Sequence, residues 1–263
     1  MNKKMTISSI LKAKGNTPLV MITAYDALFA SLLAPECDMI LVGDSLNMSF
    51  AGKSDTLSAT MDQMIYHTKA VCNGAKNSFI VCDMPFGTYT TQADALKNSI
   101  RVFQETDADC VKIEGGIDKA DIVKYLTSNS IAVCGHIGLL PQSVRSEGGY
   151  KVKGKTDAEC LSLIADARAI EDAGAFCIVI EGVKADVALE VAKSVDVPVI
   201  GIGAGCEVDG QVLVFSDMLG LFEEFTPKFV KKYLDGASLV KEAVKNYSDE
   251  VKTREFPQEI HTY

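Results

Sequence analysis

The sequence predicts a single (β/α)₈ TIM barrel over residues 1–263, with an extra N-terminal helix and C-terminal helices. Short, continuously apolar segments alternate with segments of helical periodicity, a pattern typical of a parallel sheet covered by helices. Seven or eight such units in 263 residues fit one closed barrel, and no linker or shift in composition divides them. The G-x-G-x-x-G turn expected after the first strand of an open, doubly wound sheet is absent.

The first half of the chain holds four strand–helix units. Before them, residues 8–14 are expected to form a short amphipathic helix that Gly15 and Asn16 end. Strands are expected at 19–23, 39–42, 79–82 and 109–114, and helices at 27–33, 61–72 and from Thr90 or Thr91 to about Glu105. The apolar face of this last helix is expected to consist of Ala93, Leu96, Ile100 and Phe103.

The second half repeats the alternation. Asp118 begins the helix after the fourth strand, and later helices are expected at 157–173 and 184–194. Strands are expected at 131–134, 176–180, 197–202 and 212–215. Pro227 is expected to start a final helical region, which continues into a polar tail past Tyr247.

Composition excludes several classes of function. The net charge of −9, without any basic stretch interleaved with aromatic residues, argues against a nucleic-acid partner. No window approaches the roughly 20 apolar residues of a membrane span, and no apolar run near the N-terminus is long enough for a signal peptide. A cytoplasmic protein is therefore expected.

The eight cysteines do not form a recognisable metal or redox motif. No C-x-x-C pair occurs, and Cys82, Cys110, Cys134 and Cys177 lie inside expected strands. We interpret them as small buried hydrophobic residues in a reducing compartment.

Polar residues follow the apolar core of five successive strands. Asp44 ends the second strand and Asp83 the third, Lys112 and Glu114 end the fourth, His136 the fifth and Glu181 the sixth. In a (β/α)₈ barrel the active site forms where the carboxyl ends of the strands meet. These side chains are therefore expected at one mouth of the barrel.

Three of these residues form a candidate metal site. Carboxylates from neighbouring strands repel one another unless a cation lies between them, and hard oxygen ligands without Cys or paired His favour Mg²⁺ over zinc. Asp44, Asp83 and Glu114 are the expected ligands. A carboxylate before a turn can also cap a helix, so each one alone would carry little information.

The other three polar residues have two interpretations each. Glu181 follows four apolar residues, so partial desolvation should raise its pKa and suit it to be a general base, although it could instead cap the next helix. Lys112 could support catalysis or merely neutralise Glu114. His136 is a candidate for an orienting role or for a structural histidine.

Two glycine-containing segments are further candidates. Residues 201–205 (G-I-G-A-G) are a candidate phosphate site or a close approach of backbones. The basic segment 148–154 is a candidate lid over an anionic ligand, or an ordinary solvated loop.

Ordered motifs over residues 22–229 resemble those of the ketopantoate hydroxymethyltransferase family. They are TAYD at 23–26, VGDS at 42–45, YHT at 66–68, DMPF at 83–86, KIEGG at 112–116, CGHIGL at 134–139, PQS at 141–143, GGYKV at 148–152, GIGAG at 201–205 and DGQ at 209–211. The resemblance implies a homo-decamer of TIM barrels. It also implies transfer of a one-carbon unit from 5,10-methylenetetrahydrofolate to 3-methyl-2-oxobutanoate, giving 2-dehydropantoate in pantothenate biosynthesis.

The resemblance also implies residue roles. Asp44, Asp83 and Glu114 match the Mg²⁺ positions, Asp44, Ser45, Asp83 and Lys112 match the keto-acid positions, and Glu181 matches the proton acceptor. The chain departs from the family pattern at Ser216, where a His is frequent, and at Cys206 and Lys153. These departures concern the folate side of the site.

Two other functions remain open from the residues. A Mg²⁺-dependent carbon–carbon lyase or phosphoenolpyruvate-type mutase would share the metal and a 2-oxo acid, but the chain lacks a K-K-C-G-H type loop. A barrel that only binds a metabolite is the third alternative, and the polar strand ends argue against it.

Overall fold

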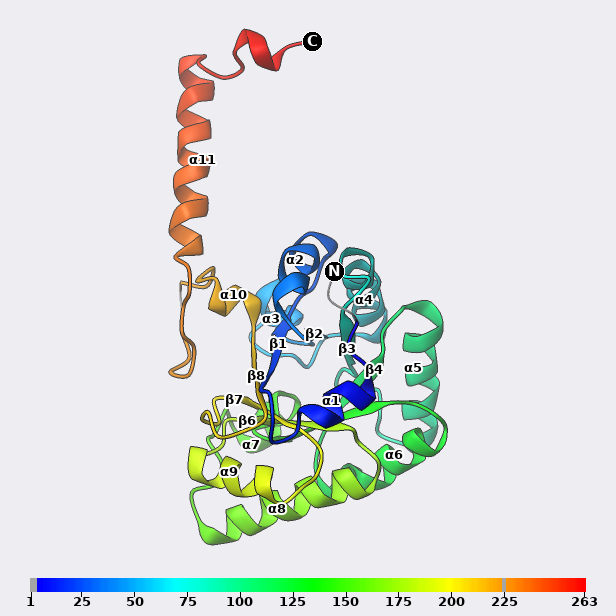
Figure 1. The fold of residues 1–263 in the computed structure, drawn as a ribbon. Coiled ribbons are helices and arrows are strands. Elements are labelled where there is room, and N and C mark those ends of the chain that lie inside the picture. Colours follow the sequence, from blue (N-terminus) through cyan, green and yellow to red (C-terminus); the bar gives the residue numbers. More distant parts are fainter. Residues whose placement is uncertain (1–3, 224–225) are drawn as a thin grey trace. The chain divides into compact units, whose positions relative to one another are not determined.

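In the computed structural model, which describes residues 4–223 and 226–263, eight parallel strands close into a barrel in chain order (Figure 1). The predicted fold class is confirmed. The strands are β1 Leu19–Thr23, β2 Met39–Val42, β3 Phe79–Asp83, β4 Cys110–Glu114, β5 Val133–Gly138, β6 Cys177–Glu181, β7 Val199–Ile202 and β8 Gly210–Leu213. Closure by pairing of β1 with β8 leaves no edge strand in the sheet.

Helices surround the strands in the region up to Val214. They are α1 Ile7–Ala13, α2 Ala27–Leu33, α3 Leu46–Ser49, α4 Met61–Gly74, α5 Gln92–Glu105, α6 Ile117–Ser128, α7 Val144–Glu147, α8 Asp157–Asp172 and α9 Ala185–Lys193, with 3₁₀ turns η1 Ala34–Glu36 and η2 Pro141–Ser143. Three of the long helices begin where a threonine hydroxyl accepts a backbone N–H, at Thr60, Thr91 and Thr156. The expected cap at Thr90 or Thr91 is therefore Thr91.

The barrel is filled by alternate residues of its strands. Leu19 and Met21 of β1, Met39 and Leu41 of β2, and Val81 of β3 belong to one buried cluster, which also contains Ile10. Ile10 comes from α1, and ion pairs join Lys14 to Asp209 and Lys4 to Asp109, residues that directly precede β8 and β4. The N-terminal helix therefore packs at the amino ends of the strands, opposite the end where the site is predicted.

Three sequence predictions differ from the structure. The fifth strand begins at Val133 and continues to Gly138, because its backbone pairs with β4 on one side and β6 on the other. The buried residues of α5 are Ala95, Ser99 and Val102, each one residue before the expected positions 96, 100 and 103. The last strand is β8 at 210–213 rather than 212–215.

By its contacts the chain divides into two compact units, Met1–Val214 and Phe215–Tyr263. The second unit contains α10 Phe215–Met218, α11 Gly236–Thr253 and η3 Glu259–His261. The helix expected from Pro227 instead begins at Gly236, because backbone bonds such as Tyr233 N–H to Met218 O hold the preceding residues in a non-helical conformation. The helix also continues past Tyr247. One domain over 1–263 stays a prediction.

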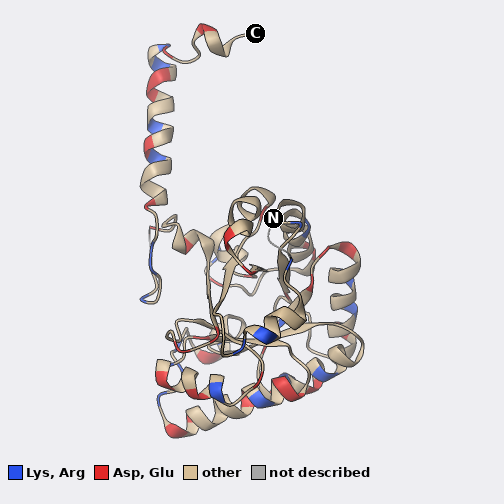
Figure 2. Cartoon of the chain, in the orientation of Figure 1, with Lys and Arg blue, Asp and Glu red and all other residues tan. Residues whose placement is uncertain are grey.

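Helix α11 carries charges of both signs along its length (Figure 2). Its apolar side chains Val240, Val244, Tyr247 and Val251 are exposed within the described residues. Across the described part of the chain, no helix is long and apolar enough to cross a membrane.

Candidate active site

The polar strand-end residues lie on the inner face of the barrel. Asp83, Lys112, Glu114, His136 and Glu181 are in phase with Val81, Cys110, Cys134 and Val179, which fill the barrel below them. Strand register places Asp83 beside Lys112 and Glu114 beside His136. All are buried except Glu181, whose side chain is 20% exposed. The structure thus brings together residues that are separated by up to 98 positions.

Lys112 lies at the centre of the carboxylates. Its Nζ is 3.1 Å from Asp83 Oδ1 and 3.0 Å from His136 Nδ1. Burial lowers the pKa of Lys112, but the surrounding charges of Asp83, Glu114 and Asp44 outweigh this and raise the pKa above its ordinary value. Lys112 is therefore a fixed cation at the barrel mouth, and its ion pair is with Asp83.

His136 connects the two glutamates. Its Nδ1 lies 3.5 Å from Glu114 Oε1, and its Nε2 lies 3.3 Å from Glu181 Oε2. The second contact is an ion-pair distance without hydrogen-bond alignment, since Nε2 has no such partner among the described residues. Burial and Lys112 lower the pKa of His136, yet the glutamates raise it to about 9. With a proton on Nε2, His136 would hold Glu181 in place, consistent with the predicted orienting role.

Asp44 and Asp83 lie side by side where β2 and β3 end. The backbone N–H of Asp44 donates to Asp83 Oδ2 at 3.0 Å, while the buried Asp83 Oδ1 forms the ion pair with Lys112 without hydrogen-bond alignment. Burial and the mutual repulsion of the carboxylates raise the pKa of Asp44, and burial raises that of Asp83. Gly43 leaves room for the Ser45 hydroxyl, because a Cβ there would lie 2.7 Å from Ser45 Oγ.

This donor set fits a hard cation held in part by solvent and substrate. Among the described residues, no three His, Cys, Asp or Glu side chains converge to enclose a metal ion by themselves. Glu114 is directed to His136 and to the backbone N–H of Gln142, whereas Asp44 and Asp83 lie side by side. Mg²⁺ is commonly held by one or two carboxylates plus water and substrate oxygens. The roles predicted for these three carboxylates stay predictions.

One buried residue of this site was not assigned a role from sequence. Gln142 donates from Nε2 to Asp44 Oδ2 at 2.9 Å and to Met84 O at 3.0 Å, and its backbone N–H donates to Glu114 Oε2 at 3.0 Å. The Tyr89 hydroxyl donates to its Oε1. The only sequence signal was its place in the P-Q-S motif.

The predicted substrate residue Ser45 lies at the start of α3. Its Oγ is 2.7 Å from the hydroxyl oxygen of Tyr25, a fully buried side chain. Burial raises the pKa of Tyr25 to about 12, so this phenol stays protonated at neutral pH. Ser45 is thereby oriented beside Asp44.

The segment after β5 is attached to its surroundings at several points. Arg145 pairs with Asp55 through Nε and an Nη at 3.1 and 2.9 Å. Lys153 pairs with Glu147, and its backbone N–H donates to Gly182 O. The role of residues 148–154 as a lid stays a prediction.

The glycine segment after β7 closely approaches its neighbour α9. A Cβ on Gly205, whose φ is 82°, would lie 2.5 Å from the Cβ of Ala185. A phosphate site at 201–205 stays a prediction. Of the departures from the family pattern, Cys206 is exposed and Ser216 is buried.

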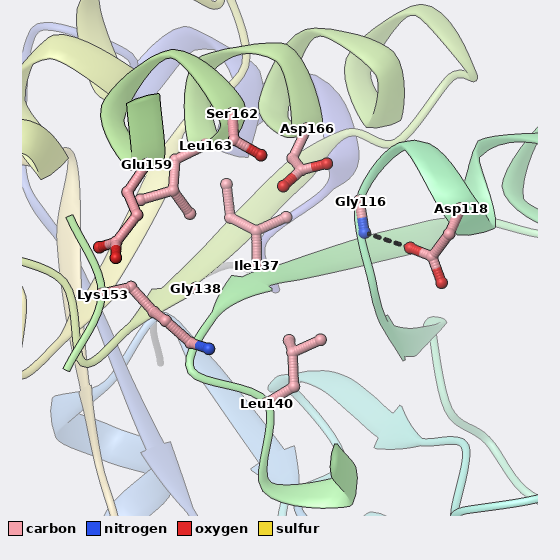
Figure 3. A pocket seen from close by; sticks show the side chains of 10 residues that line it. All are labelled: Gly116, Asp118, Ile137, Gly138, Leu140, Lys153, Glu159, Ser162, Leu163 and Asp166. Atoms are coloured by element: carbon pink, nitrogen blue, oxygen red, sulfur yellow. Dashed lines mark hydrogen bonds between the residues drawn. The ribbon is translucent and has the colours of Figure 1, made fainter. Parts of the chain in front are cut away.

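Two cavities flank this end of the barrel. One of about 300 Å³ lies between the end of β5 and α8 and contains none of the predicted site residues (Figure 3). Its lining residues are Gly116, Asp118, Ile137, Gly138, Leu140, Lys153, Glu159, Ser162, Leu163 and Asp166. The other, of about 270 Å³, is lined by Glu114 and Gln142 together with Phe86, Tyr89 and Lys119 among others. The second cavity is therefore the one next to the candidate site.

Two solved structures that share this fold are distant from this chain in sequence. A 2,3-dimethylmalate lyase of the PEP mutase/isocitrate lyase superfamily superposes with a TM-score of 0.61 at 15% identity, covering 98% of this chain and 93% of that one. A phosphonopyruvate hydrolase in complex with oxalate and Mg²⁺ superposes with a TM-score of 0.62 at 13% identity, covering 98% and 90%. These matches show a shared fold.

Sequence relatives are much closer. A 3-methyl-2-oxobutanoate hydroxymethyltransferase of Sulfurimonas denitrificans is 79% identical over all of both chains. The enzyme of the same name from Aliarcobacter butzleri is 64% identical over 99% of this chain and 97% of that one. The family model described as ketopantoate hydroxymethyltransferase matches residues 4–259. The chain belongs to the ketopantoate hydroxymethyltransferase family.

Proposed function

We propose that this enzyme transfers a hydroxymethyl group from 5,10-methylenetetrahydrofolate and water to 3-methyl-2-oxobutanoate, giving 2-dehydropantoate and tetrahydrofolate in pantothenate biosynthesis. Membership of the family and 79% identity to a relative of that name support the reaction. The observation that carries it is the cluster of buried Asp83, Lys112, Glu114 and His136 with partly exposed Glu181 at one end of the barrel.

A Mg²⁺ ion is part of the proposal. Asp44 and Asp83 would hold it, with Glu114 nearby, and a bound Mg²⁺ would polarise the 2-oxo group of the substrate as a Lewis acid. The burial of both carboxylates and the hydrogen bond from the Asp44 backbone N–H to Asp83 Oδ2 support this choice of residues.

The chain's own residues would act on charge and protons. Glu181 would accept the C3 proton of the keto acid, because its side chain alone in this group is partly exposed, and its Oε2 lies 3.3 Å from His136 Nε2. Negative charge then develops on the 2-oxo oxygen, and Lys112 would offset it with a permanent positive charge. The Ser45 hydroxyl would donate to the substrate. Carbon C3 then forms a bond with the methylene carbon, both bonds of that carbon to folate nitrogens break, and water supplies its hydroxyl group. The folate nitrogens take up one proton from that water and the one that Glu181 removed.

A folate-dependence assay tests this reaction. Turnover is measured with 3-methyl-2-oxobutanoate, 5,10-methylenetetrahydrofolate and Mg²⁺, and again with a chelator. We expect 2-dehydropantoate only when all three are present. Consumption of a 2-oxo acid without folate would instead support the lyase or mutase alternative. The shared fold alone does not distinguish that alternative from the proposed reaction. No turnover under any condition would support the metabolite-binding alternative.

We also infer self-assembly into a homo-decamer. Val240, Val244, Tyr247 and Val251 follow one another at spacings of four, three and four, so they form one apolar stripe on α11. Light scattering after size exclusion should give ten times the 28.3 kDa chain mass. A monomer, or another stoichiometry, would contradict the decamer.

A further inference from the structure

Gln142 has a hydrogen-bond partner for every polar group of its side chain, and it is 7% exposed. Its two amide hydrogens meet Asp44 Oδ2 and Met84 O, and its amide oxygen accepts from Tyr89. Its backbone N–H meets Glu114 Oε2. One residue therefore contacts the carboxyl ends of β2, β3 and β4.

Tyr89 determines which way the amide points. With its hydroxyl donating to Oε1, the NH₂ group is directed at two acceptors, Asp44 Oδ2 and Met84 O. Reversing the amide would place Oε1 against a carboxylate and a carbonyl oxygen and leave these acceptors without donors. Tyr89 thus orients the Gln142 amide, and the Gln142 amide in turn orients Asp44.

The chemical type of residue 142 also matters. Three buried carboxylates, those of Asp44, Asp83 and Glu114, lie near the cation Lys112, so the cluster retains negative charge for a further cation. A Lys or Arg at position 142 would satisfy Asp44 but neutralise that charge. A neutral amide supplies donors and leaves the charge in place.

We propose that Gln142 is a positioning residue that orients Asp44 and Glu114 for Mg²⁺, with Tyr89 acting through it. The inference deepens the proposed function and rests on its metal. Partners of metal-ligating carboxylates typically contribute 10–100-fold to metal affinity. We therefore expect Gln142→Met to weaken Mg²⁺ binding about 10–100-fold.

The test measures Mg²⁺ binding to the purified apo-protein by calorimetry, without substrate or folate. It compares wild type with Gln142→Met, Tyr89→Phe and the double variant, and uses Gln92→Met as the matched control, because this exposed glutamine donates only to Asp121 O. Tyr89→Phe should weaken binding less than Gln142→Met does. The double variant should match Gln142→Met alone, because Tyr89 acts through Gln142.

A second readout separates positioning from a purely structural role. The rise in melting temperature on adding Mg²⁺ reports the metal affinity, independently of the stability of the apo-protein in chelator. We expect this rise to shrink in Gln142→Met and to persist in Gln92→Met. A lower apo melting temperature with an unchanged Mg²⁺-dependent rise would overturn the proposal.

Further outcomes are equally decisive. Unchanged Mg²⁺ affinity in both Gln142→Met and Tyr89→Phe would overturn this inference while leaving the proposed function intact. Absence of Mg²⁺ binding by wild type would overturn the inference and the metal of the proposed function together. If Gln142→Met fails to fold, Tyr89→Phe decides alone, since it keeps the amide in place and is still expected to bind more weakly.

Discussion

Glu181→Gln is the substitution that most directly tests the proposed chemistry. Glutamine has nearly the same shape, and it can keep a contact with His136, whose Nε2 lies 3.3 Å from Glu181 Oε2. What it loses is the capacity to accept a proton. A general base contributes about 10²–10⁴-fold to a rate, which corresponds to about 3–5 kcal/mol in the activation free energy.

The assay follows exchange of the C3 proton of 3-methyl-2-oxobutanoate in D₂O by proton NMR, with Mg²⁺ and without folate. This isolates proton removal from the transfer of carbon. We expect Glu181→Gln to slow exchange about 10²–10⁴-fold while the keto acid still binds. The rate should stay at the wild-type value in Glu190→Gln, which removes an exposed glutamate that pairs with Lys193 on α9.

Exchange at the wild-type rate in Glu181→Gln would refute the reasoning and remove Glu181 from the role of base. Loss of keto-acid binding in the same variant would assign Glu181 to substrate binding instead. The melting temperature of each variant shows whether a change in rate reflects chemistry or folding.

Three further predictions follow from the structure. Ile10→Ala should lower the free energy of unfolding by about 2–5 kcal/mol in urea titrations, because Ile10 is fully buried in the cluster that fills the barrel; an unchanged midpoint would refute that packing. Cys206, the exposed thiol, should react with a thiol reagent in the native protein, and Cys206→Ser should abolish this fast phase, whereas the buried thiols react only after unfolding. The hydrogen bond and charge of Arg145 lower the pKa of Asp55 below its ordinary value of 3.8. The Arg145–Asp55 pair should therefore stabilise the segment after β5 to its full extent at any pH above 3.8, and this stabilisation should be lost as the pH falls through the lowered pKa. Hydrogen exchange in residues 144–154 should therefore be faster in Asp55→Asn than in wild type at pH 7 and equal in acid; equal rates at pH 7 would contradict the pair.

Local patterns were sufficient for most of the barrel. The strands at 19–23 and 39–42 match their predicted bounds, because unbroken apolar runs in a chain of this length have few other stable arrangements than buried parallel strands. The rule that barrel sites form at the carboxyl ends of strands then selected Asp44, Asp83, Lys112, Glu114, His136 and Glu181 before any contact was known.

Predictions failed where partners from other parts of the chain determine the local structure. Gly135 and His136 interrupt the apolar run of the fifth strand, yet hydrogen bonding to β4 and β6 continues the strand to Gly138. Residues before Gly236 were expected to be helical, but they hydrogen-bond to the segment around Met218.

The sequence by itself determined the kind of fold, the family and the residue types at the mouth of the barrel. Tertiary structure alone decided their pairing: Lys112 with Asp83, His136 between Glu114 and Glu181, and Gln142 on Asp44, 98 positions away. Periodicity specifies which side of a strand a residue occupies. Closure and register of the barrel specify which side chains of other strands lie next to that residue, and closure and register depend on all eight strands together.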